Sequence, residues 1–91
     1  MTVAVLGCWH LGSVTAACIS AAGHDVVGFD PDAAAVAGLN TGRPPIGEPG
    51  LAELVAAGTA AGRLRFTTDI AAAVAGADIV WVAFDTPVDD E

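Results

Sequence analysis

The sequence contains very few basic residues. Of its 91 residues, three are Arg and none is Lys, against eleven Asp and Glu, which gives a formal net charge of −8 at pH 7. Binding to nucleic acid or to an anionic membrane surface requires clustered Lys and Arg that neutralise phosphates. This composition therefore excludes a nucleic-acid partner and a polybasic membrane-surface module.

Long apolar runs are also missing, although 54% of the residues are hydrophobic. Gly, Pro or Asp interrupts each apolar segment well before the roughly 18 to 20 residues that span a bilayer. The first residues, Met1 to Gly7, show neither the basic lead nor the small-residue cleavage site of a secretory signal. We therefore expect no membrane segment and a cytoplasmic location.

Cysteine is scarce, since only Cys8 and Cys18 are present. Two cysteines do not make the disulfide framework of a small secreted domain, and Cys18 falls inside a predicted helix. We therefore expect two free thiols, and the sequence suggests no metal site.

What the sequence does contain is an alternation of short apolar runs with helical patterns. A mean hydropathy of +0.61 supplies enough apolar surface for one folded domain. The pattern predicts strands at residues 3–6, 26–29, 64–67 and 77–84, and helices at residues 11–22, 31–42, 51–58 and 69–76. Strands that alternate with helices predict an α/β fold, with a parallel sheet of about four strands and flanking helices.

The spacing of apolar residues also predicts which side chains face the core. In the first helix these are Leu11, Val14, Cys18, Ile19 and Ala22, and in the last helix they are Ile70, Ala73 and Val74. Trp81, in the middle of the last strand, is expected to pack against a helix.

A glycine-containing loop joins the first predicted strand to the first helix. It reads Gly7-Cys8-Trp9-His10-Leu11-Gly12, and Asp30 follows the next predicted strand. In a dinucleotide-binding fold, the first Gly of such a loop permits a tight turn and the last lets the helix pack close to the strand. The N–H groups at the start of the helix can then bind phosphate. The spacing predicts a Rossmann-like domain whose cofactor contacts include Gly7, Trp9, His10, Leu11, Gly12 and Asp30.

Asp30 predicts which dinucleotide binds. Its carboxylate can accept hydrogen bonds from both hydroxyls of the adenosine ribose, and it would repel a 2′-phosphate. No Arg or Lys follows Asp30 closely enough in the sequence to hold such a phosphate. We therefore expect NAD rather than NADP as the cofactor.

Several longer segments match the pattern of a known family. They are residues 5–12, 14–18, 23–30, 39–42, 45–51, 62–69 and 83–87. The Glu48-Pro49-Gly50-Leu51 segment and the Thr86-Pro87 pair are far more specific than a glycine loop alone. At these separations the chain resembles, over essentially all of residues 1–91, the N-terminal NAD-binding domain of the UDP-glucose/GDP-mannose dehydrogenase family.

The resemblance implies a site and a reaction. NAD would lie across Gly7 to Gly12, with Asp30 on the adenosine ribose and the Asp85-Thr86-Pro87 turn against the cofactor. The family oxidises the C6 alcohol of a UDP- or GDP-sugar to the uronate in two NAD-dependent steps, through a thiohemiacetal on a catalytic Cys. Neither Cys8 nor Cys18 matches that residue. The resemblance thus implies a partial NAD-binding domain, inactive alone, that meets the nucleotide sugar through domains absent from residues 1–91.

Three positions depart from the family pattern. Trp9 replaces the middle glycine of the loop, Ala35 stands where the family often has a basic residue near the phosphates, and Gly47 replaces an aromatic residue. The first two predict a reduced affinity for NAD. Two other interpretations stay open: a Rossmann-like methyltransferase segment that binds S-adenosylmethionine, and a non-catalytic interaction module whose cofactor cleft is filled by Trp9.

The remaining expectations concern the sheet edge and two polar residues. In the usual strand order 3-2-1-4, residues 79–84 form an outer strand with an exposed apolar edge, which predicts self-association or a homo-oligomer. Glu48 is expected to cap the helix that follows it. His24 is expected to have a structural role at a turn remote from the cofactor end.

Overall fold

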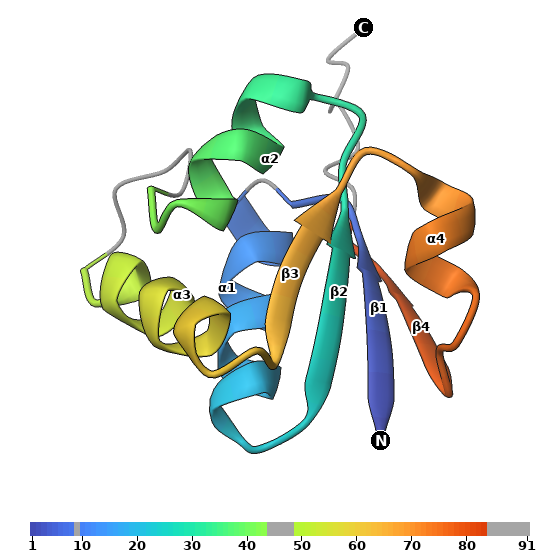
Figure 1. Cartoon of the computed structure of the whole chain (residues 1–91), viewed down its shortest axis with the longest axis horizontal. Coiled ribbons are helices and arrows are strands. Elements are labelled where there is room, and N and C mark those ends of the chain that lie inside the picture. The colour runs from blue at the N-terminus through green and yellow to red at the C-terminus, as the bar shows by residue number, and fades with distance from the viewer. Residues whose placement is uncertain (9, 44–48, 84–91) are drawn as a thin grey trace, which may run out of the picture.

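The computed structural model describes residues 1–8, 10–43 and 49–83, without the side chains of residues 10 and 11. Its elements are β1 (Thr2–Leu6), α1 (His10–Ala21), β2 (Asp25–Phe29), α2 (Ala33–Asn40), α3 (Leu51–Ala60), β3 (Leu64–Thr67), α4 (Ile70–Val74) and β4 (Ile79–Val82) (Figure 1). Each predicted strand and helix is present in its predicted place. Among the described residues, no helix is long and apolar enough to cross a membrane.

The sheet is parallel and has the predicted order β3-β2-β1-β4. Helices α1, α2 and α3 lie on one face, and α4 lies on the other (Figure 1). The main core forms between the strands and the first three helices, and a smaller cluster joins Ala73 of α4 to Val27 and Phe29 of β2. The predicted α/β fold is therefore confirmed.

The buried face of α1 differs from the prediction. Cys18 and Ala22 are exposed, so their inward placement is wrong, whereas Val14 and Ile19 are partly buried and pack against the core as predicted. Among the residues of this helix whose side chains are described, the buried ones are all small, namely Gly12, Ser13, Ala16, Ala17 and Ser20. Small side chains let a helix lie close to the sheet, so size rather than hydropathy decides which face is buried.

Two further side chains are more exposed than predicted. Trp81 is 49% exposed and Ile70 is 48% exposed. Because β4 is the last of the described strands in the order, β1 is its one neighbour among them, and α4 packs on β1, β2 and β3. The expectation that Trp81 packs against a helix is therefore wrong, as is the inward placement of Ile70.

The outer edge of β3 is closed by a side chain. Asn40, at the end of α2, donates from Nδ2 to the Phe66 carbonyl at 3.0 Å and accepts the Phe66 N–H on Oδ1 at 3.0 Å. The amide thus makes the same pair of bonds with Phe66 that a neighbouring strand would make. This arrangement satisfies both outward backbone groups of Phe66, so that this part of the edge is not open to another chain.

We expect Asn40→Ala to lower the free energy of unfolding by about 2 kcal/mol, because two partly buried backbone groups lose their partners. Asn40→Asp keeps the acceptor and loses the donor, so its loss is expected to be about half as large. Urea denaturation followed by circular dichroism measures both values. Equal stability of the Asn40→Ala variant and the parent chain would contradict this role.

Candidate functional site

The predicted loop and acid lie together at the carboxyl edge of the sheet. Gly7 follows β1 and Asp30 follows β2, and these strands are parallel neighbours. Gly7 has a φ of 96°, in the left-handed region that favours glycine. Its N–H donates to the Phe29 carbonyl at 2.7 Å. The turn therefore holds the glycine loop against the end of β2, and α1 begins directly after the loop at His10.

Gly12 allows the first helix to reach the loop. A Cβ at this position would lie 1.5 Å from the Gly7 carbonyl oxygen, which no side chain could tolerate without a backbone shift. The predicted close packing of helix against strand is present. It brings the first turn of α1, which contains no acidic residue, up to the end of β1, and such a helix start suits an anion.

Asp30 is a buried polar group at this edge with two hydrogen-bond partners. Its side chain is 2% exposed. Oδ2 accepts the Cys8 N–H at 2.9 Å, and Oδ1 accepts the Asp32 N–H at 2.9 Å. The carboxylate thus joins the glycine loop to the start of α2. Each carboxylate oxygen has a second lone pair, so the group can still accept a hydroxyl.

Asp32 begins α2 in the way its sequence position predicts. Its side chain accepts the N–H groups of Ala34 and Ala35 at 3.0 and 3.2 Å. Capping of this kind fixes the start of the helix, and with it the direction in which the chain leaves Asp30. Asp30 and Asp32, two residues apart, therefore have different partners: one binds the loop and the other caps the helix.

Cys8 points away from the open side of the loop and into the core. Its side chain is fully buried, and Sγ donates to the Phe29 carbonyl at 3.4 Å. Gly28 makes room for it, because a Cβ there would lie 2.9 Å from Sγ and 2.5 Å from the Phe66 ring. This buried position of Cys8 was not predicted from the sequence, although a glycine inside a buried strand is a known sign of close approach.

The environment of Cys8 keeps its thiol protonated. Burial, and then the nearby Asp30 carboxylate, raise the pKa of the Cys8 thiol to about 12. A protonated, buried thiol is a hydrogen-bond donor and a poor nucleophile. Both cysteines are free, as predicted.

We expect the two thiols to react at very different rates. Cys18 is exposed, whereas Cys8 is buried and only about 10⁻⁴ of it is thiolate at pH 8, given a pKa of about 12. A disulfide reagent should therefore label one thiol per native chain rapidly and two in denaturant. Cys18→Ser is the control and should remove the rapid phase. Rapid labelling of the native Cys18→Ser variant would contradict the burial of Cys8.

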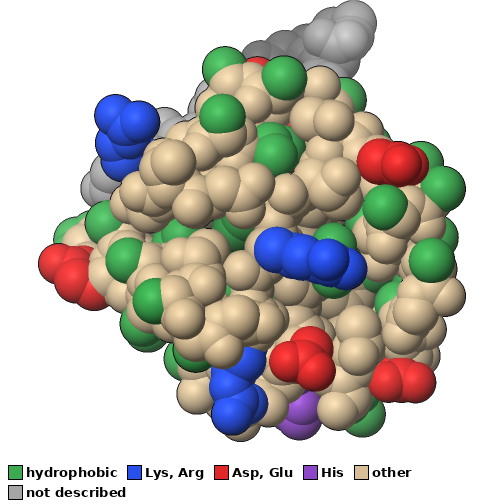
Figure 2. Space-filling view, in the orientation of Figure 1, with side chains coloured by type: hydrophobic (Ala, Val, Ile, Leu, Met, Phe, Trp, Pro, Cys, Tyr) green, Lys and Arg blue, Asp and Glu red, His purple; other side chains and the backbone are tan. Residues whose placement is uncertain are grey.

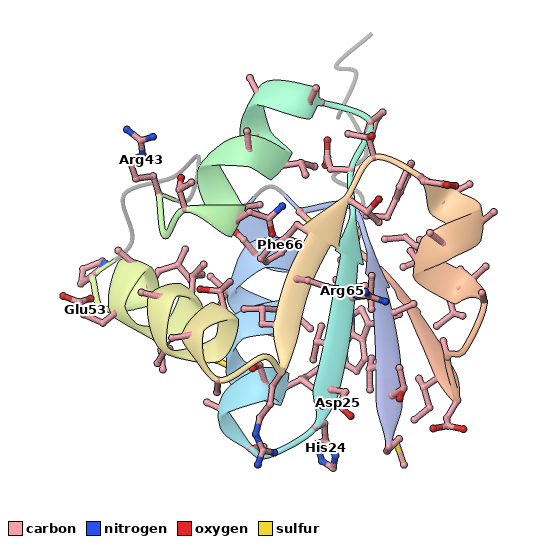
Figure 3. The ribbon with its side chains drawn as sticks, viewed as in Figure 1. His24, Asp25, Arg43, Glu53, Arg65 and Phe66 are labelled. Carbon is pink, nitrogen blue, oxygen red and sulfur yellow. The ribbon has the colours of Figure 1, made fainter. Side chains whose placement is uncertain are left out.

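A cavity of about 320 Å³ lies at the opposite end of the sheet. Its lining consists of Thr2, Asp25, Val26, Val27, Gly62, Arg63 and Arg65. In Figure 3, His24 and Asp25 lie at the amino ends of the strands, far from the loop that follows β1. The expected location of His24, remote from the glycine loop, is therefore found. This cavity is separate from the predicted cofactor contacts.

Basic side chains do not gather on the face shown in Figure 2, where each one stands apart from the others. Arg63 is already engaged, since its Nη1 donates to the Gly23 carbonyl at 2.6 Å. Among the described residues, no group of three or more His, Cys, Asp or Glu could hold a metal ion.

Several predicted site residues lie outside what the structure describes. These are Trp9, Asp85, Thr86 and Pro87, together with the side chains of His10 and Leu11. Gly47 and Glu48, and with Glu48 the expected cap, also lie outside the described residues. The structure thus brings together Gly7, Gly12 and Asp30, and the contact of each residue with a cofactor stays a prediction.

Known proteins match the chain along its whole length. The family model described as "UDP-glucose/GDP-mannose dehydrogenase family, NAD binding domain" matches residues 1–91. A GDP-mannose 6-dehydrogenase of Pseudomonas syringae pv. tomato is 44% identical over 87 residues, which are 96% of this chain and 20% of that protein. A UDP-glucose 6-dehydrogenase of Haloferax volcanii is 44% identical over 91 residues, 100% of this chain and 21% of that protein.

Solved structures of such dehydrogenases are also similar to this chain. A ternary complex of GDP-mannose dehydrogenase from Pseudomonas aeruginosa has a TM-score of 0.95 at 38% identity, covering 99% of this chain and 21% of that chain. A UDP-glucose dehydrogenase from Pyrobaculum islandicum has a TM-score of 0.91 at 38% identity, covering 98% of this chain and 21% of that chain. The chain therefore spans about a fifth of the length of these relatives. It belongs to the UDP-glucose/GDP-mannose dehydrogenase family, and it matches the NAD-binding domain of that family.

Proposed function

We propose that this chain binds the adenosine and pyrophosphate part of NAD for a nucleotide-sugar 6-dehydrogenase. The observation that carries the proposal is the position of Asp30, which ends β2 beside the glycine loop and bonds the Cys8 N–H at 2.9 Å. Family membership supplies the cofactor class. The geometry supplies residues that fit this cofactor, since the turn at Gly7, the start of α1 and a carboxylate meet at one edge.

Each part of this edge has a separate task in the proposed complex. The turn at Gly7 and the close packing at Gly12 bring the first N–H groups of α1 to the pyrophosphate. Asp30 accepts the ribose hydroxyls on its remaining lone pairs and repels a 2′-phosphate, which favours NAD over NADP. When bound, NAD supplies the hydride acceptor for the oxidation.

The reaction proposed for the whole enzyme is oxidation of the C6 alcohol of a UDP- or GDP-sugar to the uronate. We place this reaction in the cytoplasm, where its product would be used for polysaccharide synthesis. The chain spans about a fifth of its relatives, and Cys8 is buried and protonated. We therefore expect the 91-residue chain alone to show no dehydrogenase activity. The nucleotide sugar would be bound by parts of the enzyme outside these residues.

Calorimetric titration of the 91-residue chain with NAD and with NADP tests the binding proposal. We expect NAD to bind and NADP to bind at least about tenfold more weakly, which corresponds to roughly 1.4 kcal/mol. Trp9→Gly restores the glycine of the family pattern and is expected to tighten NAD binding. Tighter binding of NADP would contradict the proposal. Binding by the Trp9→Gly variant alone would instead support the interaction module in which Trp9 fills the cleft.

A further inference from the structure

The glycine-loop residue Cys8 contacts the end of β2 through both its backbone and its side chain. Its N–H donates to Asp30 Oδ2 at 2.9 Å, and its Sγ donates to the Phe29 carbonyl at 3.4 Å. The Val5 carbonyl is a second acceptor within reach of Sγ, at 3.9 Å. One residue of the loop is thus joined to two consecutive residues, Phe29 and Asp30, where β2 ends.

The sheet leaves a space that the Cys8 side chain fills. Val5, Gly28 and Phe66 are register partners in β1, β2 and β3. A Cβ at Gly28 would lie 2.9 Å from Cys8 Sγ, and 2.5 and 2.7 Å from two atoms of the Phe66 ring. The thiol and the ring therefore share the room that the missing side chain leaves, and both are buried. Close packing of this kind restricts where residue 8 can lie.

The Cys8 thiol meets the Phe29 carbonyl as a donor. Burial, and then the Asp30 carboxylate, raise the pKa of the thiol to about 12, so the proton stays on the sulfur at neutral pH. A thiolate would instead place a second negative charge beside Asp30 and against a carbonyl oxygen. The protonated side chain therefore stabilises the loop in the position that brings the Cys8 N–H to Asp30.

The orientation of the Asp30 carboxylate decides which lone pairs face a bound ribose. Oδ1 accepts the Asp32 N–H from the start of α2, and Oδ2 accepts the Cys8 N–H from the glycine loop. These two donors hold opposite oxygens, so together they fix the rotation of the carboxylate about its Cβ–Cγ bond. If the Cys8 N–H moves away, the carboxylate can turn and its remaining lone pairs change direction.

We propose that Cys8 is a positioning residue for NAD binding: its side chain, packed over Gly28, holds the loop N–H that orients Asp30 toward the adenosine ribose. The inference rests on the proposed cofactor function of Asp30. The Cys8 side chain is fully buried, so it acts through Asp30 rather than by touching the dinucleotide.

Three variants show what the side chain at position 8 contributes. Cys8→Ala removes the sulfur and its contacts, whereas Cys8→Ser keeps a donor of similar size. A loop that holds its binding geometry about a fifth of the time binds roughly fivefold more weakly. We therefore expect Cys8→Ala to weaken NAD binding about fivefold, and Cys8→Ser to weaken it less than about twofold. Cys18→Ala makes the same change at the exposed cysteine and should bind NAD like the parent chain.

A double-mutant cycle with Asp30→Asn separates positioning from a general loss of stability. Calorimetric titration with NAD gives the effect of Cys8→Ala in both backgrounds. We expect about fivefold in the parent chain and less than about twofold beside Asp30→Asn, because the charged contact that Cys8 positions is then already absent. The same factor in both backgrounds would overturn the proposal. Circular dichroism checks that each variant is folded.

Hydrogen exchange of the backbone amides, measured by NMR without NAD, tests the contact itself. In Cys8→Ala the residue 8 amide should exchange at least about tenfold faster than in the parent chain, and in Cys8→Ser it should not. The Gly7 and Asp30 amides, which donate to Phe29 and Thr67 carbonyls, are the internal controls. Equal acceleration at all three amides would show a structural role only and would contradict the proposal.

The two measurements distinguish failure of this inference from failure of the proposed function. If the parent chain binds NAD and Cys8→Ala binds it equally well, the positioning role is wrong and the cofactor function stands. If neither the parent chain nor Cys8→Ser binds NAD, the proposed function is wrong, and the positioning role falls with it even where the exchange of the residue 8 amide changes as expected.

Discussion

Gly12→Ala is expected to lower the free energy of unfolding by more than about 3 kcal/mol. The added Cβ would lie 1.5 Å from the Gly7 carbonyl oxygen, and the atom it meets belongs to the backbone. Relief requires α1 to move away from β1 or the turn at Gly7 to change. Overpacking that is absorbed by flexible side chains costs about 1 to 3 kcal/mol, and a backbone clash exceeds that range. A domain with about 5 to 15 kcal/mol of stability would lose much of it.

Gly76→Ala provides the control for this experiment. Gly76 follows α4, nothing lies within 4 Å of the position of its Cβ, and its φ is not in the left-handed region. The same chemical change there is expected to alter stability by less than about 0.5 kcal/mol. Urea denaturation followed by circular dichroism compares the three chains. Equal midpoints for Gly12→Ala and Gly76→Ala would show that α1 does not depend on its contact with Gly7.

The parts of the fold that follow from local signals could be predicted from the sequence. A β-branched run ending at Gly7, a second run ending at Asp30 and an N-capping Asp69 each define an element through its own neighbours. Because parallel strands end at the same edge of a sheet, the order of elements alone placed Gly7 beside Asp30. The family pattern added the cofactor class, which no single loop could specify.

The buried face of α1 could not be predicted because hydropathy and size conflict there. Cys18 and Ile19 are more apolar than Ala16 and Ala17, yet the alanines are fully buried and Cys18 is exposed. At Gly12 the helix lies so close to the end of β1 that no side chain fits, and the fully buried residues that follow are small, while Val14 and Ile19 pack against the core from partly buried positions. Hydrophobic spacing identified the helix correctly, but the face that it buries depends on the distance to the sheet.

Contacts between residues far apart in the chain could not be predicted from the sequence either. The Asn40 amide meets Phe66 across 26 positions, and Asp30 meets the Cys8 N–H across 22. A polar residue at a helix end or a strand end has many possible partners, and only the packed fold selects one. Trp81 could not be placed for a related reason: a large apolar side chain is expected to be buried, but its strand is the outermost of the described sheet, and the sequence of the strand does not show this.

The contact of Asp30 with Cys8 leads to the second large effect, since the carboxylate supports the fold as well as the proposed ribose site. In Asp30→Ala, the N–H groups of Cys8 and Asp32 both lose a charged acceptor. Hydrogen bonds to charged groups contribute about 1.5 to 3 kcal/mol each, so we expect a loss of at least about 3 kcal/mol in the free energy of unfolding. An absence of NAD binding in this variant would therefore not separate the two roles.

Asp30→Asn separates them. The amide keeps one carbonyl oxygen as an acceptor, but its NH₂ group must face one of the two N–H donors. We therefore expect the free energy of unfolding to fall by about 1 to 2 kcal/mol, which leaves the chain folded. Removing the charge should weaken NAD binding about tenfold. It should also reduce the difference in affinity between NAD and NADP, because the repulsion of the 2′-phosphate disappears. Asp32→Asn carries the same charge change on an exposed cap that Asn serves equally well, and it should leave both titrations unchanged. Calorimetric titration of the folded variants with NAD and with NADP measures these differences. If the Asp30→Asn chain still prefers NAD over NADP as strongly as the parent chain does, the preference must come from another residue.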